Sequence, residues 1–335
     1  MAVNQYGDIS PRTAAWASTE LLRRATPYLV LEKFGQAVTV PANKTKLVKF
    51  RRYNALPLAV TPITEGVTPG STAISTTDVS ATLVQLGAVV QISDIIQDTH
   101  EDPVLAEMTN VLAEQAAQSI EGLRFQVLKG GTNVVYSNNV AGRSSVVAPI
   151  QVSTSTPVLT NQNRITRALK RQNGRYITKV LRSTPNWETV NVAASFVCVV
   201  HPDLEGDIRS LPNFTPVERY GQMTPYESEL GKVNDVRYVT STLNTSIANA
   251  GGTVGTNIST GGSNSDVYLS LYIGADAYGI VALKGMTGVT PMVVNPKPSD
   301  SDPLAQRASV GWKALSTAVI LNDLWMVRLE STATL

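Results

Sequence analysis

Residues 102–131 read DPVLAEMTNVLAEQAAQSIEGLRFQVLKGG and form the longest amphipathic segment of the chain. Asp102 is a natural N-cap, Pro103 fits the first helical position, and the Gly130-Gly131 pair favours termination. Between them, apolar residues recur at the three- and four-residue spacing of a single helical stripe. The pattern predicts a helix over residues 103–129. At about 1.5 Å per residue this helix is roughly 40 Å long, which is typical of a structural strut.

Two strands joined by a long loop are predicted on the N-terminal side of this helix. The first, residues 44–53, carries basic and apolar side chains on both faces, whereas the second, residues 80–93, alternates apolar and polar side chains. Prolines and glycines between the two strands prevent regular pairing there. Because a two-stranded ribbon is marginally stable alone in water, we expect residues 36–95 to project and to lie on a neighbouring molecule.

The first strand of this ribbon gathers cations. We expect these cations to pair with acidic side chains of a neighbouring subunit rather than with nucleic acid. The residues predicted to make inter-subunit contacts are Lys44, Lys46, Lys49, Arg51, Arg52 and Glu65.

The two ends of the chain give weaker patterns. Residues 1–35 hold too few large apolar side chains to bury themselves, and they are predicted to form an arm. Residues 310–329 are predicted to form a hairpin that turns at Asn322-Asp323. Residues 247–266 are rich in Gly, Ser, Thr and Asn, which predicts a flexible surface loop.

Basic residues concentrate in the middle of the chain. Residues 120–185 hold ten basic residues and one acidic residue, whereas residues 186–335 hold nine and fourteen. A second helix, predicted over residues 164–172 and capped by Asn161 or Asn163, presents several of these cations. They either contact phosphates without sequence preference or form a solvated helix face. The cations of this helix are Arg164, Arg167, Lys170 and Arg171.

The composition excludes several classes of protein. Hydrophobic residues make up 43% of the chain and charged residues 16%, which is too apolar for a disordered protein and poor in charge for a free cytosolic enzyme. The single cysteine, Cys198, lies in an apolar run, so a disulfide framework and cysteine-ligated metal centres are excluded. The N-terminus lacks the apolar core of a secretory signal, and no stretch approaches the ~18 apolar residues of a membrane helix.

Few residues are suited to catalysis. The only histidines are His100 and His201, and each is followed by acidic residues, as a metal-dependent hydrolase would require. Both directly precede a predicted helix start, however, where short polar and acidic side chains are favoured for capping. The glycine-rich segments lack the Lys-Ser/Thr of a phosphate-binding loop, and no Gly-x-Ser-x-Gly elbow is present. We therefore expect no catalytic residue, no metal ion and no cofactor.

The order of these features (arm, projecting ribbon, long helix, mixed α/β domain and C-terminal hairpin) resembles that of the major capsid proteins of tailed bacteriophages. Multi-residue segments carry the resemblance in matching order, nearly end to end. They are YGDISPR (residues 6–12), FRRY (50–53), TEGVTP (64–69), DTHEDP (98–103), HPDLE (201–205), DAYG (276–279), VGWK (310–313) and ILND (320–323). Within that group the chain resembles the class of large virulent podoviruses with a virion-packaged RNA polymerase.

The resemblance implies an α+β chain with the Johnson fold, which tailed phages and herpesviruses share. It also implies a division of the chain into four parts. These are an N-terminal arm (residues 1–36), an extended β-hairpin loop (37–96), a peripheral domain that contains the spine helix (97–190 and 306–335) and an axial domain (191–305).

In function, the resemblance implies a major capsid protein that assembles into pentamers and hexamers of an icosahedral shell around double-stranded DNA. The implied partners are identical subunits, packaged DNA, and portal, scaffold and decoration proteins, with no membrane. The implied location is the virion, after synthesis in the host bacterial cytoplasm. Residues 120–185 are then expected to line the interior, with the four cations of the second helix nearest the DNA. The alternatives are another virion component, such as a decoration or tail protein, and, less favoured, the metal-dependent hydrolase.

Overall fold

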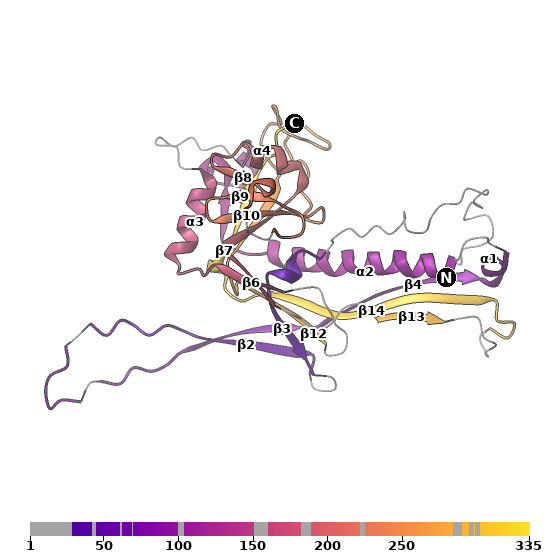
Figure 1. The fold of residues 1–335 in the computed structure, drawn as a ribbon, viewed down its shortest axis with the longest axis horizontal. Helices are drawn as coiled ribbons and strands as arrows, with labels where there is room; N and C mark the ends of the chain where they lie inside the picture. Colours follow the sequence, from indigo (N-terminus) through magenta and orange to yellow (C-terminus); the bar gives the residue numbers. More distant parts are fainter. Residues whose placement is uncertain are drawn as a thin grey trace.

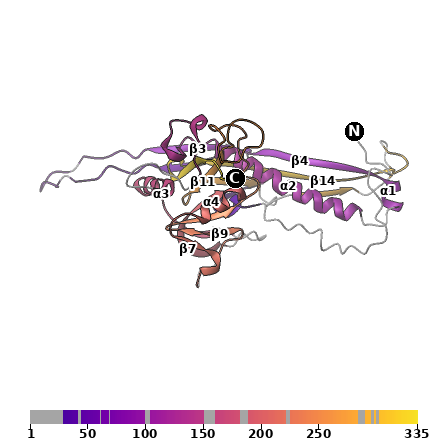
Figure 2. The ribbon, with the colours of Figure 1, turned by 90° about the horizontal axis from the view of Figure 1, so that it is seen from above.

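The computed structural model describes residues 29–41, 45–60, 62–68, 70–99, 104–150, 160–181, 189–221, 225–283, 290–294, 298 and 302–335. Three parts are visible in Figure 1. They are a globular body, a limb in which helix α2 (Val104–Lys129) lies beside strands β4 (Val84–Ser93) and β14 (Arg307–Ile320), and a ribbon formed by β2 (Leu47–Tyr53) and β3 (Thr76–Thr82). Seen from above, the limb and the ribbon leave the body in opposite directions (Figure 2).

The body is built on an eight-stranded sheet. Its order is β5 (Val134–Tyr136), β15 (Met326–Ser331), β11 (Tyr268–Ile273), β7 (Thr189–Val200), β10 (Val236–Thr240), β9 (Glu229–Val233) and β8 (Phe214–Pro216), and β6 (Ile177–Leu181) pairs with β7. The body also contains helices α3 (Asn161–Arg171) and α4 (Glu205–Arg209).

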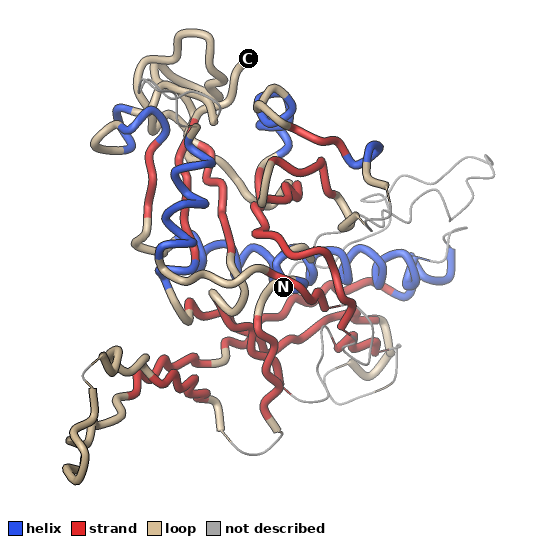
Figure 3. The backbone as a smooth tube through the Cα atoms, turned by 60° about the vertical axis from the view of Figure 1, so that its left-hand side comes forward, coloured by secondary structure: helices blue, strands red, loops and turns tan. Residues whose placement is uncertain are grey.

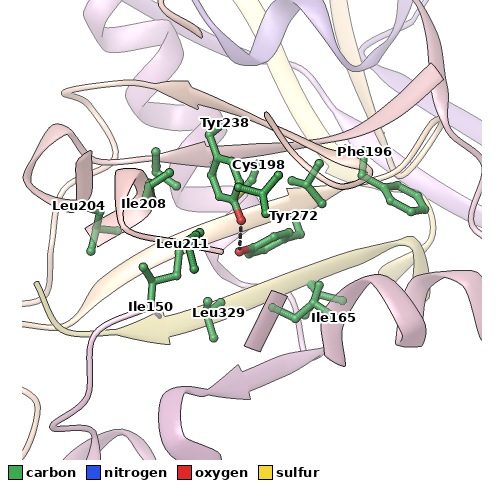
Figure 4. Packing of buried hydrophobic residues seen from close by; sticks show 14 of the residues in the cluster. Ile150, Ile165, Phe196, Cys198, Leu204, Ile208, Leu211, Tyr238, Tyr272 and Leu329 are labelled. Carbon is green, nitrogen blue, oxygen red and sulfur yellow. Dashed lines mark hydrogen bonds between the residues drawn. The ribbon is translucent and has the colours of Figure 1, made fainter. Parts of the chain in front are cut away.

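Both faces of this sheet are covered, because side chains along β7 alternate between two apolar clusters. Phe196, Cys198 and Val200 pack with α3 and α4, whereas Val197 and Val199 pack with the C-terminal end of α2. The first cluster is shown in Figure 4, where the hydroxyls of Tyr238 and Tyr272 form a hydrogen bond of 3.1 Å within otherwise apolar surroundings. Burial raises the pKa of the Cys198 thiol and of both tyrosines well above their ordinary values.

The limb is built on a five-stranded sheet. Its order is β1 (Gln36–Val40), β12 (Tyr278–Leu283), β14 and β13 (Thr290–Val294), and β4 also pairs with β14. The predicted helical stripe packs on one face of this sheet: Leu112, Ala116 and Ile120 of α2 lie against Trp312 and neighbouring residues of β14. The indole N–H of Trp312 donates to Gln115 at 3.2 Å, which satisfies the polar atom of a nearly buried side chain.

The predicted strand over residues 80–93 is two strands with different partners. β3 pairs with β2 in the ribbon, whereas β4 pairs with β14 in the limb, and short helix α1 (Asp94–Thr99) follows β4. The break falls at Leu83, whose side chain is buried with Val40, Ala81 and Val281. Apolar and polar residues alternate on both sides of Leu83. The alternation alone therefore does not show where the pairing changes from β2 to β14.

The predicted hairpin over residues 310–329 is wrong. β14 and β15 lie in different sheets, and a 3₁₀ turn at Asp323–Trp325 connects them. The Asp323 carboxylate accepts hydrogen bonds from the backbone N–H of Thr132, at 3.2 and 3.0 Å. This long-range anchor directs β15 into the body instead of back along β14.

Two further predictions differ from the structure. Val30, Leu31 and Phe34, in the last part of the predicted arm, are buried in the core of the body against α2 and β12. The predicted flexible loop is tied down, because Asp266 accepts hydrogen bonds from the backbone N–H of Asn249 and of Thr260. Backbone bonds to distant segments hold the same loop, including one from Gly252 N–H to the carbonyl of Val146 at 2.9 Å.

The two sheets also cross the domain boundaries implied by the resemblance. β6 and β15 were expected in the peripheral domain, but they pair with β7 and β11 of the expected axial domain. Conversely, β12 and β13 pair with β14 in the limb. Among the described helices, none is long and apolar enough to span a membrane.

Candidate assembly surfaces

The ribbon is a regular antiparallel pair that stands away from the body (Figure 3). Its register places Arg51 opposite Asp78, and the Arg51 Nε and Nη2 atoms each donate to a carboxylate oxygen at 2.8 Å. The hydrogen bond and the charge of Asp78 raise the pKa of Arg51, and the hydrogen bond from Arg51 lowers the pKa of Asp78. This pair fixes the register of the ribbon from its exposed face.

The register adds a partner within the chain for one predicted contact residue. Asp78 lies opposite Arg51 and binds it, and the Arg51 side chain remains 58% exposed, so its contact with a neighbouring subunit stays a prediction. Lys44 lies outside the described residues. The predicted contact residues that are exposed on the ribbon or its loop are Lys46, Lys49, Arg52 and Glu65.

The loop at the end of the ribbon carries an apolar surface that the sequence reading missed. Leu58, Val60 and Ile63 are 88%, 81% and 76% exposed, and four other large apolar side chains are exposed nearby. These four are Tyr53, Leu56, Val67 and Ile74. We call these seven residues the ribbon tip. The available signal was the recurrence of large apolar residues in a proline-rich segment whose described residues include only one charge, Glu65. Exposed apolar patches of this kind mark contact sites with other molecules.

The base of the ribbon is rooted in the limb. Ala81 and Leu83 are buried with Val40 of β1 and Val281 of β12, and Val48 and Phe50 of β2 pack against them. The ring of Phe50 also lies directly over Gly279, where a Cβ atom would come within 2.9 Å of it. Glycine at this position therefore allows the ribbon to approach β12 closely. The direction in which the ribbon leaves the limb is fixed by this packing.

A buried ionic contact ties the N-terminal described segment to α2. The Glu121 carboxylate accepts hydrogen bonds from the backbone N–H of Val30 at 2.9 Å and of Leu31 at 2.6 Å. Arg124 bridges Glu121 and Glu32, with an Nη1–oxygen distance of 3.2 Å to each. Burial raises the pKa of Glu121, and Arg124 and the two N–H groups oppose this effect. These contacts fix the segment that begins at Val30 to helix α2.

The four cations predicted to face DNA lie on α3. This helix begins at Asn161, and the hydroxyl of its N-cap residue, Thr160, accepts a hydrogen bond from Asn163 N–H. Arg164 donates to Asn139 at 2.7 Å, and Lys170 forms an ion pair with Asp235. The hydrogen bond with Asp235 raises the pKa of Lys170, and the same bond lowers the pKa of Asp235. Two of the four cations are therefore engaged within the chain.

The two remaining cations of α3 are available to another molecule. Arg167 and Arg171 are exposed, and neither forms a hydrogen bond or an ion pair with a described residue. No described residue places an aromatic ring on either guanidinium, so their contact with a polyanion would be through charge.

The histidines do not form a metal centre within the described part of the chain. His201 caps the turn that precedes α4: its Nδ1 accepts from the backbone N–H of Asp203 at 3.2 Å. Asp203 in turn accepts a hydrogen bond from Tyr268 at 2.6 Å. Burial lowers the pKa of His201, and nearby Lys129 lowers it further, while Asp203 opposes this. His100 lies outside the described residues, and no group of three or more metal-ligating side chains is found among those described.

Comparison with known protein families identifies the group to which these surfaces belong. A family model described as phage capsid protein matches residues 76–329. The match begins at strand β3 of the ribbon and continues through the helix and strands of the limb and most of the body. The chain belongs to the phage capsid protein family.

Solved structures of phage capsids share the fold of this capsid protein. The capsid of Ralstonia phage GP4 aligns with a TM-score of 0.61 at 13% identity, covering 97% of this chain and 99% of that chain. The head of Helicobacter pylori bacteriophage KHP40 gives 0.59 at 12% identity, covering 90% and 88%. The capsid of cyanophage P-SCSP1u gives 0.56 at 15% identity, covering 98% and 94%. No curated protein sequence matches the chain.

Family membership and fold together settle the class of function. The chain is a major capsid protein with the α+β Johnson-type fold, and it builds shells of identical subunits. It is a structural protein and not an enzyme, so the metal-dependent hydrolase is set aside. The features that remain to be assigned are therefore the contacts between copies.

Proposed function

We propose that this capsid protein forms the pentamers and hexamers of an icosahedral shell that encloses double-stranded DNA. The ribbon carries the proposal. It leaves the body with seven exposed apolar side chains at its tip, and covering them requires another molecule. In a shell of identical subunits that molecule is a second copy, and head-to-tail contacts of this kind close into rings when the rotation permits.

Burial of surface between subunits, and not a chemical reaction, supplies the free energy of assembly. A ribbon that lies along a neighbour, together with an N-terminal arm, buries more than the ~1,600 Å² of a standard pairwise interface. Arg52 lies beside the apolar tip, and Lys49 and Lys46 follow along β2 toward the base of the ribbon. These exposed cations are suited to the rim of such an interface. The part of the expected peripheral domain that carries α2 and β14 lies in the limb, and strands β9, β10 and β11 of the expected axial domain lie in the body.

We assign Arg167 and Arg171 of α3 to the interior surface, where they contact packaged DNA without sequence preference. Their exposure supports this assignment, as does the excess of basic residues between positions 120 and 185. The subunit is made in the host bacterial cytoplasm and ends in the virion, where portal, scaffold and decoration proteins are its further partners. The capsid segments quoted from the sequence further favour the class of podoviruses that package an RNA polymerase.

The test is expression of the chain and electron microscopy of the particles. A triple variant, Leu58→Ser, Val60→Ser and Ile63→Ser, removes apolar surface from the ribbon tip without touching the folded parts. We expect the wild type to form shells and the triple variant to remain as free subunits or open fragments. Leu324→Ser, at an exposed apolar residue away from the ribbon, is the control and is expected to form normal shells. Normal shells from the triple variant would refute the role of the ribbon.

A second variant removes the loop itself. Deleting residues 57–72 leaves residues 54–56 and 73–75 between β2 and β3. Asn54 N–H donates to the carbonyl of Ser75 at 3.0 Å, so the remaining loop is the four residues 55, 56, 73 and 74, a length that hairpins accept. This variant keeps the Arg51–Asp78 pair and the rooted base of the ribbon. We expect it to fold, as judged by an unchanged unfolding midpoint, and to lose assembly.

A further inference from the structure

Asn173 and Gly174 form the only Asn-Gly sequence in the chain. They follow α3 directly, because Gln172 is the C-cap of that helix. An asparagine that precedes glycine is prone to lose its side-chain amide, since glycine has no side chain to hinder attack by its own backbone nitrogen. The geometry of the helix end therefore decides whether this pair reacts.

The end of α3 is a Schellman motif. The backbone N–H of Asn173 donates to the carbonyl of Lys170 at 3.0 Å, and the N–H of Gly174 donates to the carbonyl of Leu169 at 2.9 Å. Asn173 has a φ of 54°, in the left-handed region that asparagine tolerates better than most residues. A Cβ atom at Gly174 would lie 2.9 Å from the Leu169 carbonyl oxygen, so glycine is favoured there. The fold thus selects both members of the reactive pair.

The same motif restrains the reaction. Loss of the amide begins when the backbone nitrogen of Gly174 attacks Cγ of the Asn173 side chain. In the folded helix the N–H of that nitrogen is donated to the Leu169 carbonyl, so the attack requires this hydrogen bond to break. Asn173 is exposed, and helix ends open locally at a lower free-energy cost than the core. Opening of the last turn of α3 therefore controls the rate.

We propose that Asn173 is a modification site, where spontaneous deamidation, controlled by opening of the last turn of α3, places a negative charge beside the cations assigned to DNA. The site and the reaction go beyond the proposed function, and the effect on DNA rests on it.

The reaction needs water and no other reactant. A bond forms between the Gly174 nitrogen and Cγ of Asn173, and the bond from Cγ to the side-chain nitrogen breaks. That nitrogen leaves as ammonia and carries away the Gly174 amide proton. Water then opens the cyclic imide at either of its two carbonyls. The products are aspartate and isoaspartate, each with a carboxylate in place of the amide.

The new carboxylate is unfavourable at this position. Residue 173 lies between Arg171 and Arg175, which are both exposed. A negative charge at the C-terminal end of a helix opposes the helix dipole, and it also repels phosphate groups. Isoaspartate lengthens the backbone as well, so it does not fit the Schellman motif. Conversion therefore loosens the last turn and weakens the contact of Arg171 with DNA.

Peptide mass spectrometry of the wild-type chain, folded and in denaturant at the same pH, tests the site. We expect Asn173 to convert before any other asparagine in the folded chain, at a rate about tenfold to a thousandfold below the unfolded rate. Hydrogen exchange of the Gly174 amide should be slowed by the same factor, because both processes require the same opening. Equal folded and unfolded rates, a different factor for exchange, or earlier conversion of Asn264 before Ser265 overturns the proposal. Conversion no faster than global unfolding allows also overturns it.

Two variants test the control by the last turn. The indole N–H of Trp325 donates to the carbonyl of Gln172 at 3.0 Å and helps to hold the turn. Trp325→Phe removes this bond, and we expect it to speed conversion of the folded chain by about twofold to tenfold without changing the unfolded rate. Asn173→Gly places the usual residue of a Schellman motif at this position and cannot react, so it is the control for the fold. The same folded rate in Trp325→Phe and the wild type would contradict control by the turn.

A third variant, Asn173→Asp, reproduces the charge of the product. We expect it to bind DNA at least about twofold more weakly than Asn173→Gly at low salt. Equal binding by the two variants overturns the effect on DNA. If replacing Arg167 and Arg171 by Gln leaves DNA binding unchanged, the proposed DNA contact fails, whereas conversion of Asn173 is decided by mass spectrometry alone.

Discussion

Glu121→Ala is expected to lower the free energy of unfolding of the unassembled subunit by about 3–5 kcal/mol, the usual cost of removing one partner of a buried ion pair. The carboxylate is fully buried and accepts from the N–H groups of Val30 and Leu31. Loss of the carboxylate leaves both N–H donors without this acceptor. It also leaves the Arg124 side chain, which is 6% exposed, with Glu32 as its one remaining ion-pair partner among the described residues.

The assay is urea denaturation of the unassembled subunit at pH 7, followed by tryptophan fluorescence. With an m-value of about 3 kcal/mol/M, the expected loss moves the midpoint down by roughly 1–2 M. The matched control is Glu227→Ala, which removes the partner of Lys33 in the same segment. Because Glu227 is 61% exposed, that pair is expected to contribute about 0–1 kcal/mol. A loss for Glu121→Ala no larger than that of the control would refute the reasoning.

Three other outcomes follow from the described contacts. Burial lowers the pKa of Lys129 from 10.5 to about 8, so the unfolded chain binds more protons between these values and stability rises with pH there. In urea titrations between pH 7.5 and 9.5, Lys129→Met should reduce the pH-dependent gain in the free energy of unfolding by about 1 kcal/mol, a value that allows for the partial exposure of the side chain. The same dependence on pH in the variant and the wild type would contradict this prediction. Cys198 is fully buried with a raised pKa, so a thiol reagent should label it only at the rate of unfolding; fast labelling of the native subunit would contradict the core packing. Replacing Arg167 and Arg171 by Gln should reduce the slope of log K for DNA binding against log salt concentration by about 2 and leave shell size unchanged. The control Arg209→Gln on α4 should change neither quantity. An unaltered slope in the double variant would show that α3 does not contact DNA.

Local signals predicted the limb well. The apolar stripe and the terminal glycines of α2 are contained within one continuous segment, and the described helix ends at Lys129 as expected. The alternation over residues 80–93 was also visible in the sequence, because period two is a local property. In the structure, Leu86, Ala88 and Val90 of β4 lie on the face that packs with α2. The projecting ribbon was predicted from its proline-rich connection and its lack of a clean apolar face.

Contacts between distant segments were not predictable from the same patterns. Val30, Leu31 and Phe34 are too few to suggest a core, but they join one whose other members lie on α2 and β12. The turn at Asp323 has the composition of a hairpin, and the backbone of Thr132, far away in the sequence, sends the chain into another sheet. The Arg51–Asp78 pair depends on the register, which the sequence leaves open when neither face of a strand is clearly apolar.

Cryo-electron microscopy of shells assembled from this chain tests the central claim most directly, which is that the ribbon is completed by a neighbouring copy. We expect ordered density for Leu58, Val60 and Ile63 against the surface of an adjacent subunit, with these side chains inaccessible to solvent. Shells in which residues 54–75 extend into solvent and touch no other copy would contradict it.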